Sequence, residues 1–270
     1  NLHLVRCLLD EVFGRENFVA VLTFRKTGGQ SALVIPSIAD YLLWYAKNRE
    51  LLKSRPLFVF KVAEESGVAE HYEYIELPNG ERRRMTSAER GNPQLLPEGS
   101  RIFQPTSLQA DTPSRSTTFD PVFEGKNFEA KSWKTNVEGF ERLTKAERVF
   151  AFRVTPRYIR YLDDFPVKAL TNVWDDTMGE RELLYAVQTN TKVIERCILM
   201  TTDPGDLVLD PTCGSGTTAY VAEKWGRRWI TCDTSRVAIA IARQRLMTAV
   251  FDYYELAHPE EGVGSGFKYK

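Results

Sequence analysis

The stretch Asp210-Pro211-Thr212-Cys213-Gly214-Ser215-Gly216-Thr217-Thr218 is the most informative part of this 270-residue chain. It follows a short apolar segment, 207–209, and its last two residues begin a segment with helical periodicity, 217–225. Gly214 and Gly216 lack a Cβ atom, so the backbone can turn through positive φ and a ligand can approach it closely. In a doubly wound α/β sheet, ligands bind where such a turn leaves the carboxyl end of a strand. The stretch therefore predicts a ligand-binding loop in an α/β fold.

Strands and helices are predicted to alternate on both sides of this loop. The expected elements are a helix around 193–198, a turn at 203–206, strands at 207–209 and 228–232, and helices at 217–225 and 235–248. This order predicts parallel strands joined by helical crossovers. Nearer the start, an amphipathic helix ends at Gly14, and two strands of one sheet are expected at 18–24 and 41–46.

Two carboxylates are predicted to lie at the ends of the two parallel strands. Asp210 ends the first strand, where it can accept from a cationic amino group or from loop amides. Asp233 ends the second strand, where an acidic side chain accepts hydrogen bonds from ribose hydroxyls. The spacing GxGxxG of dinucleotide folds is missing from the loop, which disfavours NAD and FAD. The pair predicts a nucleoside site.

At these residues the chain resembles the β-class DNA amino-methyltransferases, particularly the modification subunits of type III restriction systems. Their first cofactor motif reads Asp-Pro-Phe-Cys-Gly-Ser-Gly-Thr, and Thr212 stands here in place of the aromatic residue. The family places a second cofactor segment upstream, and 187–190 occupies that place with Gln188 but without the family's Lys-Pro. Segments 8–14 and 158–176 also look like family segments.

The resemblance implies a Rossmann-like S-adenosylmethionine-dependent methyltransferase core with an inserted target-recognition module. It implies S-adenosyl-L-methionine as the cofactor and transfer of its methyl group to an exocyclic amino group in DNA, with adenine N6 favoured over cytosine N4. The predicted cofactor-binding residues are Gln188, Thr189, Asn190, Asp210, Pro211, Cys213, Gly214, Ser215, Gly216, Thr217 and Asp233.

The resemblance and the periodicity together divide the chain into four parts. Residues 1–61 and 165–252 are predicted to form the core, 62–164 the inserted module, and 253–270 the start of a further region. In the middle the periodicity weakens, and Arg82–Arg84 and Ser107–Thr118 look least ordered.

Residues 81–160 carry 15 basic and 10 acidic side chains, which favours contact with DNA phosphates. The predicted DNA-binding residues are Arg25, Lys26, Gln30, Lys126, Lys131, Trp133 and Lys134. The alternative is that Trp133 and Phe140 form the small core of the module, with the lysines on its solvated face.

The base-holding motif of the family, Asp-Pro-Pro-Tyr, is missing, because none of the 13 prolines is adjacent to another. Asp120-Pro121 and Asp203-Pro204 share only a dipeptide with it. The order of motifs in the family places the catalytic residues before Asn1, so they are unknown here. We expect the isolated fragment to be inactive. A methyltransferase acting on RNA or a small molecule, or a fragment that only binds cofactor or DNA, are the alternatives.

Composition excludes several other classes of protein. Cys7, Cys197, Cys213 and Cys232 form no CxxC pair, so we expect reduced core thiols and no metal site. Apolar runs long enough to span a membrane are missing from the sequence, as is a secretory signal, which predicts a cytoplasmic protein. The expected partners are double-stranded DNA and either a restriction subunit or a second copy of the chain.

Overall fold

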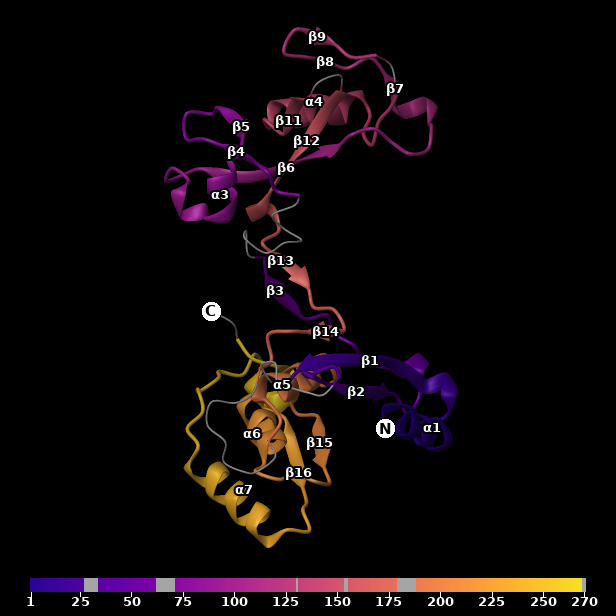
Figure 1. Ribbon diagram of the computed structural model, residues 1–270, viewed down its shortest axis with the longest axis vertical. Coiled ribbons are helices and arrows are strands. Elements are labelled where there is room, and N and C mark those ends of the chain that lie inside the picture. The colour runs from indigo at the N-terminus through magenta and orange to yellow at the C-terminus, as the bar shows by residue number, and fades with distance from the viewer. Residues whose placement is uncertain (27–33, 62–70, 130, 153–154, 179–187, 269–270) are drawn as a thin grey trace. The chain divides into compact units, whose positions relative to one another are not determined.

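The structure, a computed structural model, describes residues 1–26, 34–61, 71–129, 131–152, 155–178 and 188–268 (Figure 1). The chain forms two compact units. Unit 1 consists of residues 1–57 and 169–270, and unit 2 consists of residues 58–168. The sequence predicted an inserted module at 62–164, and its role in target recognition stays a prediction. Within the described ranges, no helix is long and apolar enough to cross a membrane.

Unit 1 contains a three-stranded sheet with the order β14-β1-β2. β1 (Phe18–Arg25) pairs antiparallel with β2 (Ala39–Tyr45) and parallel with β14 (Val173–Trp174). The two predicted strands therefore belong to one sheet, as expected from their β-branched and aromatic residues. The predicted first helix is α1 (Leu2–Phe13), and Tyr45 of β2 donates to Asp10 of that helix at 2.6 Å.

Helix α5 (Thr191–Thr201) links this sheet to the rest of unit 1. On one side, Val193 and its neighbours pack on a cluster with Leu22, Phe24 and Trp174. On another side, Ile198 packs with residues of the next helix, α6 (Thr217–Lys224). A helix that is buried between two layers needs apolar side chains on both of the sides that it buries.

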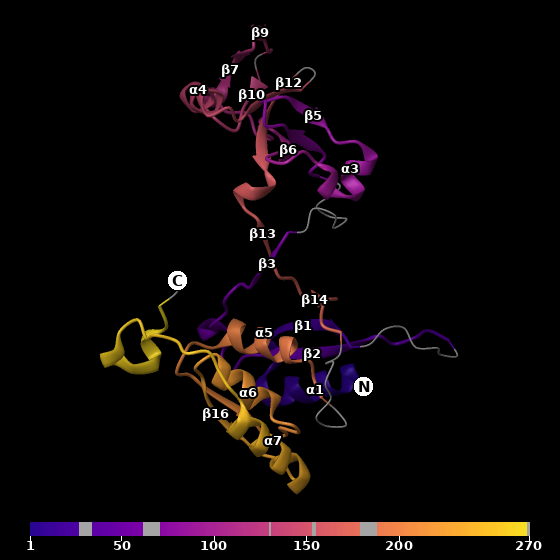
Figure 2. The same ribbon diagram turned by 90° about the vertical axis from the view of Figure 1, so that its left-hand side faces the viewer.

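The predicted parallel pair is β15 (Leu207–Asp210) and β16 (Arg228–Thr231). Helix α6 connects the two strands, and α7 (Arg236–Thr248) follows the second (Figures 1 and 2). Val208 and Trp229 face α6, because side chains alternate along a strand. The opposite face exposes 63% of Leu209 and 50% of Ile230. This parallel arrangement of strands and helices gives unit 1 the predicted α/β class.

Unit 2 is built on a five-stranded antiparallel sheet with the order β11-β12-β6-β4-β5. Tyr74, Phe103, Phe150 and Tyr161 form an aromatic cluster on this sheet. The five strands are β4 (Tyr74–Glu76), β5 (Arg82–Arg84), β6 (Arg101–Ser107), β11 (Val149–Phe152) and β12 (Thr155–Tyr161). A second cluster packs α4 (Val137–Lys145) through Phe140 against Trp133 and Val149.

The remaining elements are short. They are β3 (Phe58–Phe60), which pairs with β13 (Val167–Ala169); β7 (Thr118–Phe119), which pairs with β10 (Lys131–Ser132); β8 (Val122–Phe123), which pairs with β9 (Lys126–Asn127); α3 (Ser87–Gly91); and the 3-10 helices η1 (Arg15–Asn17), η2 (Arg49–Leu51), η3 (Pro93–Leu95), η4 (Arg115–Thr117), η5 (Leu162–Asp164) and η6 (Pro259–Ser265).

The run Arg82–Arg84 is a strand, which corrects the expectation that it is poorly ordered. Each arginine has its own carboxylate partner. Arg82 pairs with Glu76 at 2.5 Å, Arg83 with Glu89 at 2.6 Å, and Arg84 with Glu73 at 2.8 Å. These pairs neutralise the like charges of the run, which would otherwise repel one another.

The basic surplus of the middle third also disappears at the boundaries of the folded unit. Unit 2 contains 17 basic and 17 acidic side chains, because the wider range adds two lysines but seven carboxylates. A DNA-binding role for unit 2 therefore depends on where individual cations lie and not on its net charge.

Candidate cofactor site

The predicted ligand loop leaves the carboxyl end of β15, beside the carboxyl end of β16. The amide of Cys232 donates to the carbonyl of Asp210, and the amide of Cys213 donates to the carbonyl of Cys232, both at 2.9 Å. These bonds extend the parallel pairing, in which Asp210 is opposite Thr231. Asp210 and Asp233 therefore lie at the same edge of two neighbouring strands.

The carboxylate of Asp233 fixes the backbone of the loop. Its Oδ1 accepts from the amide of Ser235, and its Oδ2 accepts from the amide of Gly214, both at 2.8 Å. The bond from Ser235, followed by that from Gly214, lowers the pKa of Asp233 below its ordinary value. The ionised carboxylate thus holds the loop, and each oxygen keeps a further lone pair for a hydroxyl donor.

The other end of the loop is shaped by Asp210 and by two glycines. Oδ1 of Asp210 accepts from the amide of Thr212 at 3.0 Å. Aspartate favours local turns that are closed by such a bond to the amide two residues on. Gly214 and Gly216 adopt φ of +51° and +77°. A Cβ on Gly216 would lie 2.8 Å from the Cβ of Ala242 in α7, so a side chain there would collide with the helix. The glycines are thus required by the backbone and by packing.

The upstream segment reaches the loop through Gln188. Ser215 Oγ donates to Oε1 of Gln188 at 3.2 Å. Asn190 instead caps α5, because its Oδ1 accepts from the amide of Lys192 at 2.8 Å. Val187, the first residue of the predicted upstream segment, lies outside the described residues.

A cavity of about 450 Å³ opens at this loop. Seven of the predicted residues line it, namely Gln188, Thr189, Asp210, Cys213, Gly214, Ser215 and Thr217. Pro211 is exposed, Gly216 lies against α7, and Asn190 and Asp233 are outside the lining. The prediction missed Ile194, Leu209, Thr212 and Thr218, although three of them are in or directly beside the quoted stretch.

The chemistry of this lining fits a zwitterionic nucleoside ligand. Thr217 and Thr218, the first two residues of α6, line the cavity, and the unpaired backbone amides at the amino end of a helix favour an anionic group such as a carboxylate. Asp210 supplies the opposite charge for an ammonium group, and the apolar side chains of Ile194 and Leu209 complete the wall. An amino-acid group attached to a nucleoside carries both charges.

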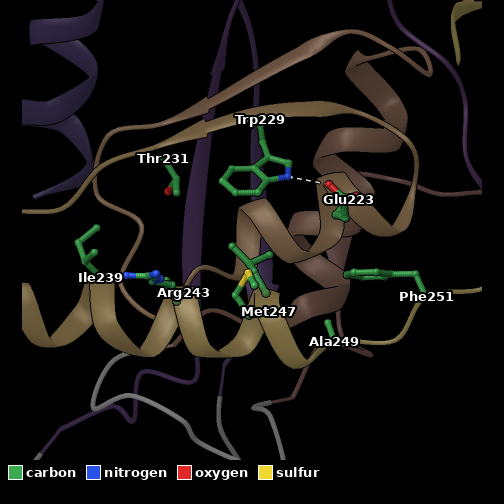
Figure 3. A pocket seen from close by; sticks show the side chains of 10 residues that line it. Glu223, Trp229, Thr231, Ile239, Arg243, Met247, Ala249 and Phe251 are labelled. Carbon is green, nitrogen blue, oxygen red and sulfur yellow. Dashed lines mark hydrogen bonds between the residues drawn. The ribbon is translucent and has the colours of Figure 1, made fainter. Parts of the chain in front are cut away.

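A second, apolar cavity of about 540 Å³ lies between β16 and α7 (Figure 3). Figure 3 shows Trp229 pointing from its strand toward Met247 of the helix, with its Nε1 donating to Glu223 at 2.9 Å. Residues 210–216 take no part in its lining. The candidate cofactor site is therefore the cavity at the loop and not this larger cavity.

The predicted DNA-contacting residues fall into different environments. Trp133 is 1% exposed, and its Nε1 donates to the carbonyl of Phe119 at 2.9 Å. A buried indole cannot reach a DNA backbone, which corrects the prediction for Trp133. Lys126 and Lys134 are exposed, and Lys131 in β10 is half-buried. The alternative of a small core around Trp133 with lysines outside it describes this region.

The second predicted DNA-contacting group lies at the end of β1. Lys26 is 2.9 Å from Asp40, and both side chains are about half exposed. Arg25 is the last residue of the strand and is half-buried. Gln30 lies outside the described residues.

The cysteines are free thiols in two kinds of surroundings. Cys197 is largely buried, which raises its pKa to about 11, and Cys213 is buried in the loop. Cys7 and Cys232 are exposed, which corrects the expectation that all four are core residues. In the part of the chain that the structure describes, no group of three or more metal-ligating side chains is found.

Comparison with known proteins gives one family and several relatives. The family model described as DNA methylase, of the N6 and N4 type, matches residues 1–244. The type II methyltransferase M.EcaI of Enterobacter cloacae is 26% identical over 89% of this chain and 50% of its own length. The HindVI Mod subunit of Haemophilus influenzae, described as a probable type III restriction-modification enzyme, is 24% identical over 91% of this chain and 40% of its own length. The chain thus spans about half the length of these relatives or less.

Solved structures are similar to this chain at a lower level. TTHA0409 of Thermus thermophilus, solved with S-adenosyl-L-methionine, is 18% identical over 90% of this chain and 58% of that chain, with a TM-score of 0.36. M1.HpyAVI, also solved with S-adenosylmethionine, is 28% identical over 27% of this chain and 36% of that chain, with a TM-score of 0.25.

Proposed function

Because the chain belongs to the N6/N4 DNA methylase family, we propose that it is the cofactor-binding and target-recognition part of a site-specific DNA methyltransferase. The enzyme transfers a methyl group from S-adenosylmethionine to the exocyclic amino group of a base. The observation that carries the proposal is the loop at residues 210–218, held beside Asp233 at the edge of two parallel strands. Family membership alone would not say which residues bind the cofactor.

The residues of the loop suit different parts of the cofactor. The amino end of α6 and the hydroxyl of Thr217 would hold the carboxylate, and Asp210 would hold the ammonium group. Asp233 would accept from the ribose hydroxyls with the lone pairs that the loop amides leave free. When bound, S-adenosylmethionine supplies an electrophilic methyl group on a sulfonium centre.

In the proposed function, the residues of this chain bind the cofactor and orient it, and other residues hold the target base. Methyl transfer needs the amino nitrogen of the base in line with the methyl group, after the base has left the DNA stack. An acidic and aromatic loop is required to hold that base, and none of the 13 prolines of the sequence forms the adjacent pair of the family's motif. We infer that the 270-residue chain binds the cofactor but does not transfer the methyl group by itself.

Adenine N6 is the proposed target, because the chain resembles type III modification subunits in its cofactor motif. The HindVI Mod relative, described as a probable type III restriction-modification enzyme, supports a role in restriction-modification, where a restriction subunit is one candidate partner and a second copy of the chain is another. Cytosine N4 is the alternative target.

The test is methyl transfer by a protein that contains this chain together with a base-holding segment. Tritiated S-adenosylmethionine and duplex DNA are incubated with it, and the DNA is digested and separated into nucleosides. We expect label in N6-methyladenine. Label in N4-methylcytosine would correct the base, and label in RNA but not in DNA would overturn the proposed substrate.

A further inference from the structure

Arg245 of α7 contacts the cofactor loop through hydrogen bonds to Thr217 and Ser215. Its Nη1 lies 3.0 Å from Oγ1 of Thr217 and 3.5 Å from the carbonyl oxygen of Ser215. Its guanidinium carbon lies 4.6 Å from the centre of the Tyr220 ring. Ser215 is 3% exposed and Thr217 is 6% exposed, so this is the buried side of the loop.

The helix can come this close because small residues face the loop. Ala238 and Ala242 are 0% and 2% exposed, and Ala242 packs against Gly216. Residues three and four apart lie on one face of a helix, so Ala238, Ala242 and Arg245 form a single stripe. The stripe places the guanidinium below the amino end of α6, where the loop passes into the helix.

The bond to Thr217 fixes what its hydroxyl can do. A guanidinium has only donors, so Oγ1 of Thr217 must be the acceptor of this bond. The hydroxyl proton of Thr217 then points either to Oγ of Ser215, which lies 3.5 Å away, or to a ligand in the cavity that Thr217 lines. Arg245 therefore fixes Thr217 as a hydrogen-bond donor on the cavity side, with a ligand competing for its proton only against the long contact to Ser215.

The same guanidinium is connected to the upstream segment. The carbonyl of Ser215 accepts from Arg245, while the hydroxyl of the same residue donates to Gln188 at 3.2 Å. Ser215 thus joins α7 to the segment before α5, and all three loop-facing residues, Gln188, Ser215 and Thr217, line the cavity.

We propose that Arg245 is a positioning residue, which acts through Thr217 and Ser215 to prepare the loop for the carboxylate of the cofactor's amino-acid group. This proposal rests on the proposed function, because it takes S-adenosylmethionine as the ligand. Arg245 itself does not line the cavity, and its effect passes through the hydroxyl and the backbone that do.

The test compares two ligands on three forms of the 270-residue chain. S-adenosylmethionine carries the carboxylate, and 5′-methylthioadenosine keeps the nucleoside but lacks the amino-acid group. Arg245→Met removes the donors and keeps much of the length of the side chain, and Arg245→Lys keeps the charge. Arg243→Met is the matched control, since Arg243 is exposed on the same helix. Calorimetric titration gives the affinities, and thermal unfolding without ligand reports on the fold.

We expect Arg245→Met to weaken S-adenosylmethionine binding about tenfold, the typical effect of losing a charged hydrogen bond. Binding of 5′-methylthioadenosine should stay within about twofold, because a nucleoside without a carboxylate makes no use of that hydrogen bond. Arg245→Lys should restore part of the loss, and Arg243→Met should change neither affinity. Equal weakening of both ligands, or no change for either, would overturn the positioning role. If the unaltered chain is folded and binds neither ligand, the proposed function itself is wrong.

Discussion

Gly216 is the residue where backbone conformation and packing both constrain the cofactor loop, so replacing it with alanine is a demanding test. The residue has φ +77° and ψ +27°, a left-handed conformation that costs an L-residue roughly 1–2 kcal/mol. An added Cβ would also lie 2.8 Å from the Cβ of Ala242. Forcing an extra methyl group into a packed site costs about 1–3 kcal/mol. Gly216→Ala should therefore destabilise unit 1 by roughly 2–5 kcal/mol.

Two further variants separate the two contributions. Gly80 has φ +84°, and among the described residues no heavy atom lies within 4 Å of its ideal Cβ. Gly80→Ala should therefore show only the conformational cost, roughly 1–2 kcal/mol. Ala242→Gly removes the atom that the new methyl group meets, so the double variant Gly216→Ala/Ala242→Gly should recover about 1–3 kcal/mol of coupling energy.

Hydrogen exchange followed by mass spectrometry measures these effects in each unit separately, because amide protection reports local opening energies. A steric conflict at Gly216 is refuted if Gly216→Ala lowers the opening free energy of its unit by no more than Gly80→Ala does, or if the cycle with Ala242→Gly shows no coupling. Either result would mean that α7 does not press against the loop as the structure describes.

Three other perturbations test separate parts of the account. Asp233→Asn should weaken S-adenosylmethionine binding about tenfold in a calorimetric titration, because an amide can accept at one oxygen only, whereas the carboxylate accepts from two backbone amides; unchanged affinity would leave Asp233 as a local cap only. The Arg196 guanidinium holds the pKa of Asp176 at about 2, so the stabilisation that this carboxylate contributes is present at neutral pH and is lost as pH falls from about 4 to 2. The free energy of unfolding of Asp176→Asn, measured against pH, should therefore change less in that window than that of the unaltered chain. Removing the exposed Lys126 should lower the slope of log affinity for DNA against log salt concentration by about 1 in a filter-binding series, and an unaltered slope would exclude a phosphate contact there. Trp133→Ala, by contrast, should lower the stability of unit 2 by about 3–5 kcal/mol in thermal unfolding, because this side chain is buried.

The geometry of the candidate cofactor loop could be predicted because its determinants are local in sequence. The glycines, Asp210 and the start of the following helix lie within nine residues, from Asp210 to Thr218, and their spacing predicts a strand, a tight turn and a helix. Asp233 could be placed at the same edge because parallel strands joined by one helix end side by side. These predictions needed no knowledge of distant contacts.

The remaining features depend on contacts between residues far apart in the chain. Arg245 meets Thr217 across 28 positions, and no spacing rule links the two. Arg82 looked like part of a disordered basic run, but its partner Glu76 lies on the neighbouring strand. Trp133 could be read as a DNA contact or as a core residue, and only its burial decides between the two. The net charge of residues 81–160 did not predict the net charge of the folded unit, because that unit spans residues 58–168.

The most direct test of the central claim is a calorimetric titration of S-adenosylmethionine into the folded 270-residue chain, repeated in the presence of excess NAD⁺. We expect each chain to bind one molecule of S-adenosylmethionine that NAD⁺ does not displace, because the loop at 210–218 lacks the dinucleotide spacing. Binding should also be weakened in the Asp233→Asn variant. A folded chain that binds no S-adenosylmethionine, or one from which NAD⁺ displaces it, would contradict the assignment of the site.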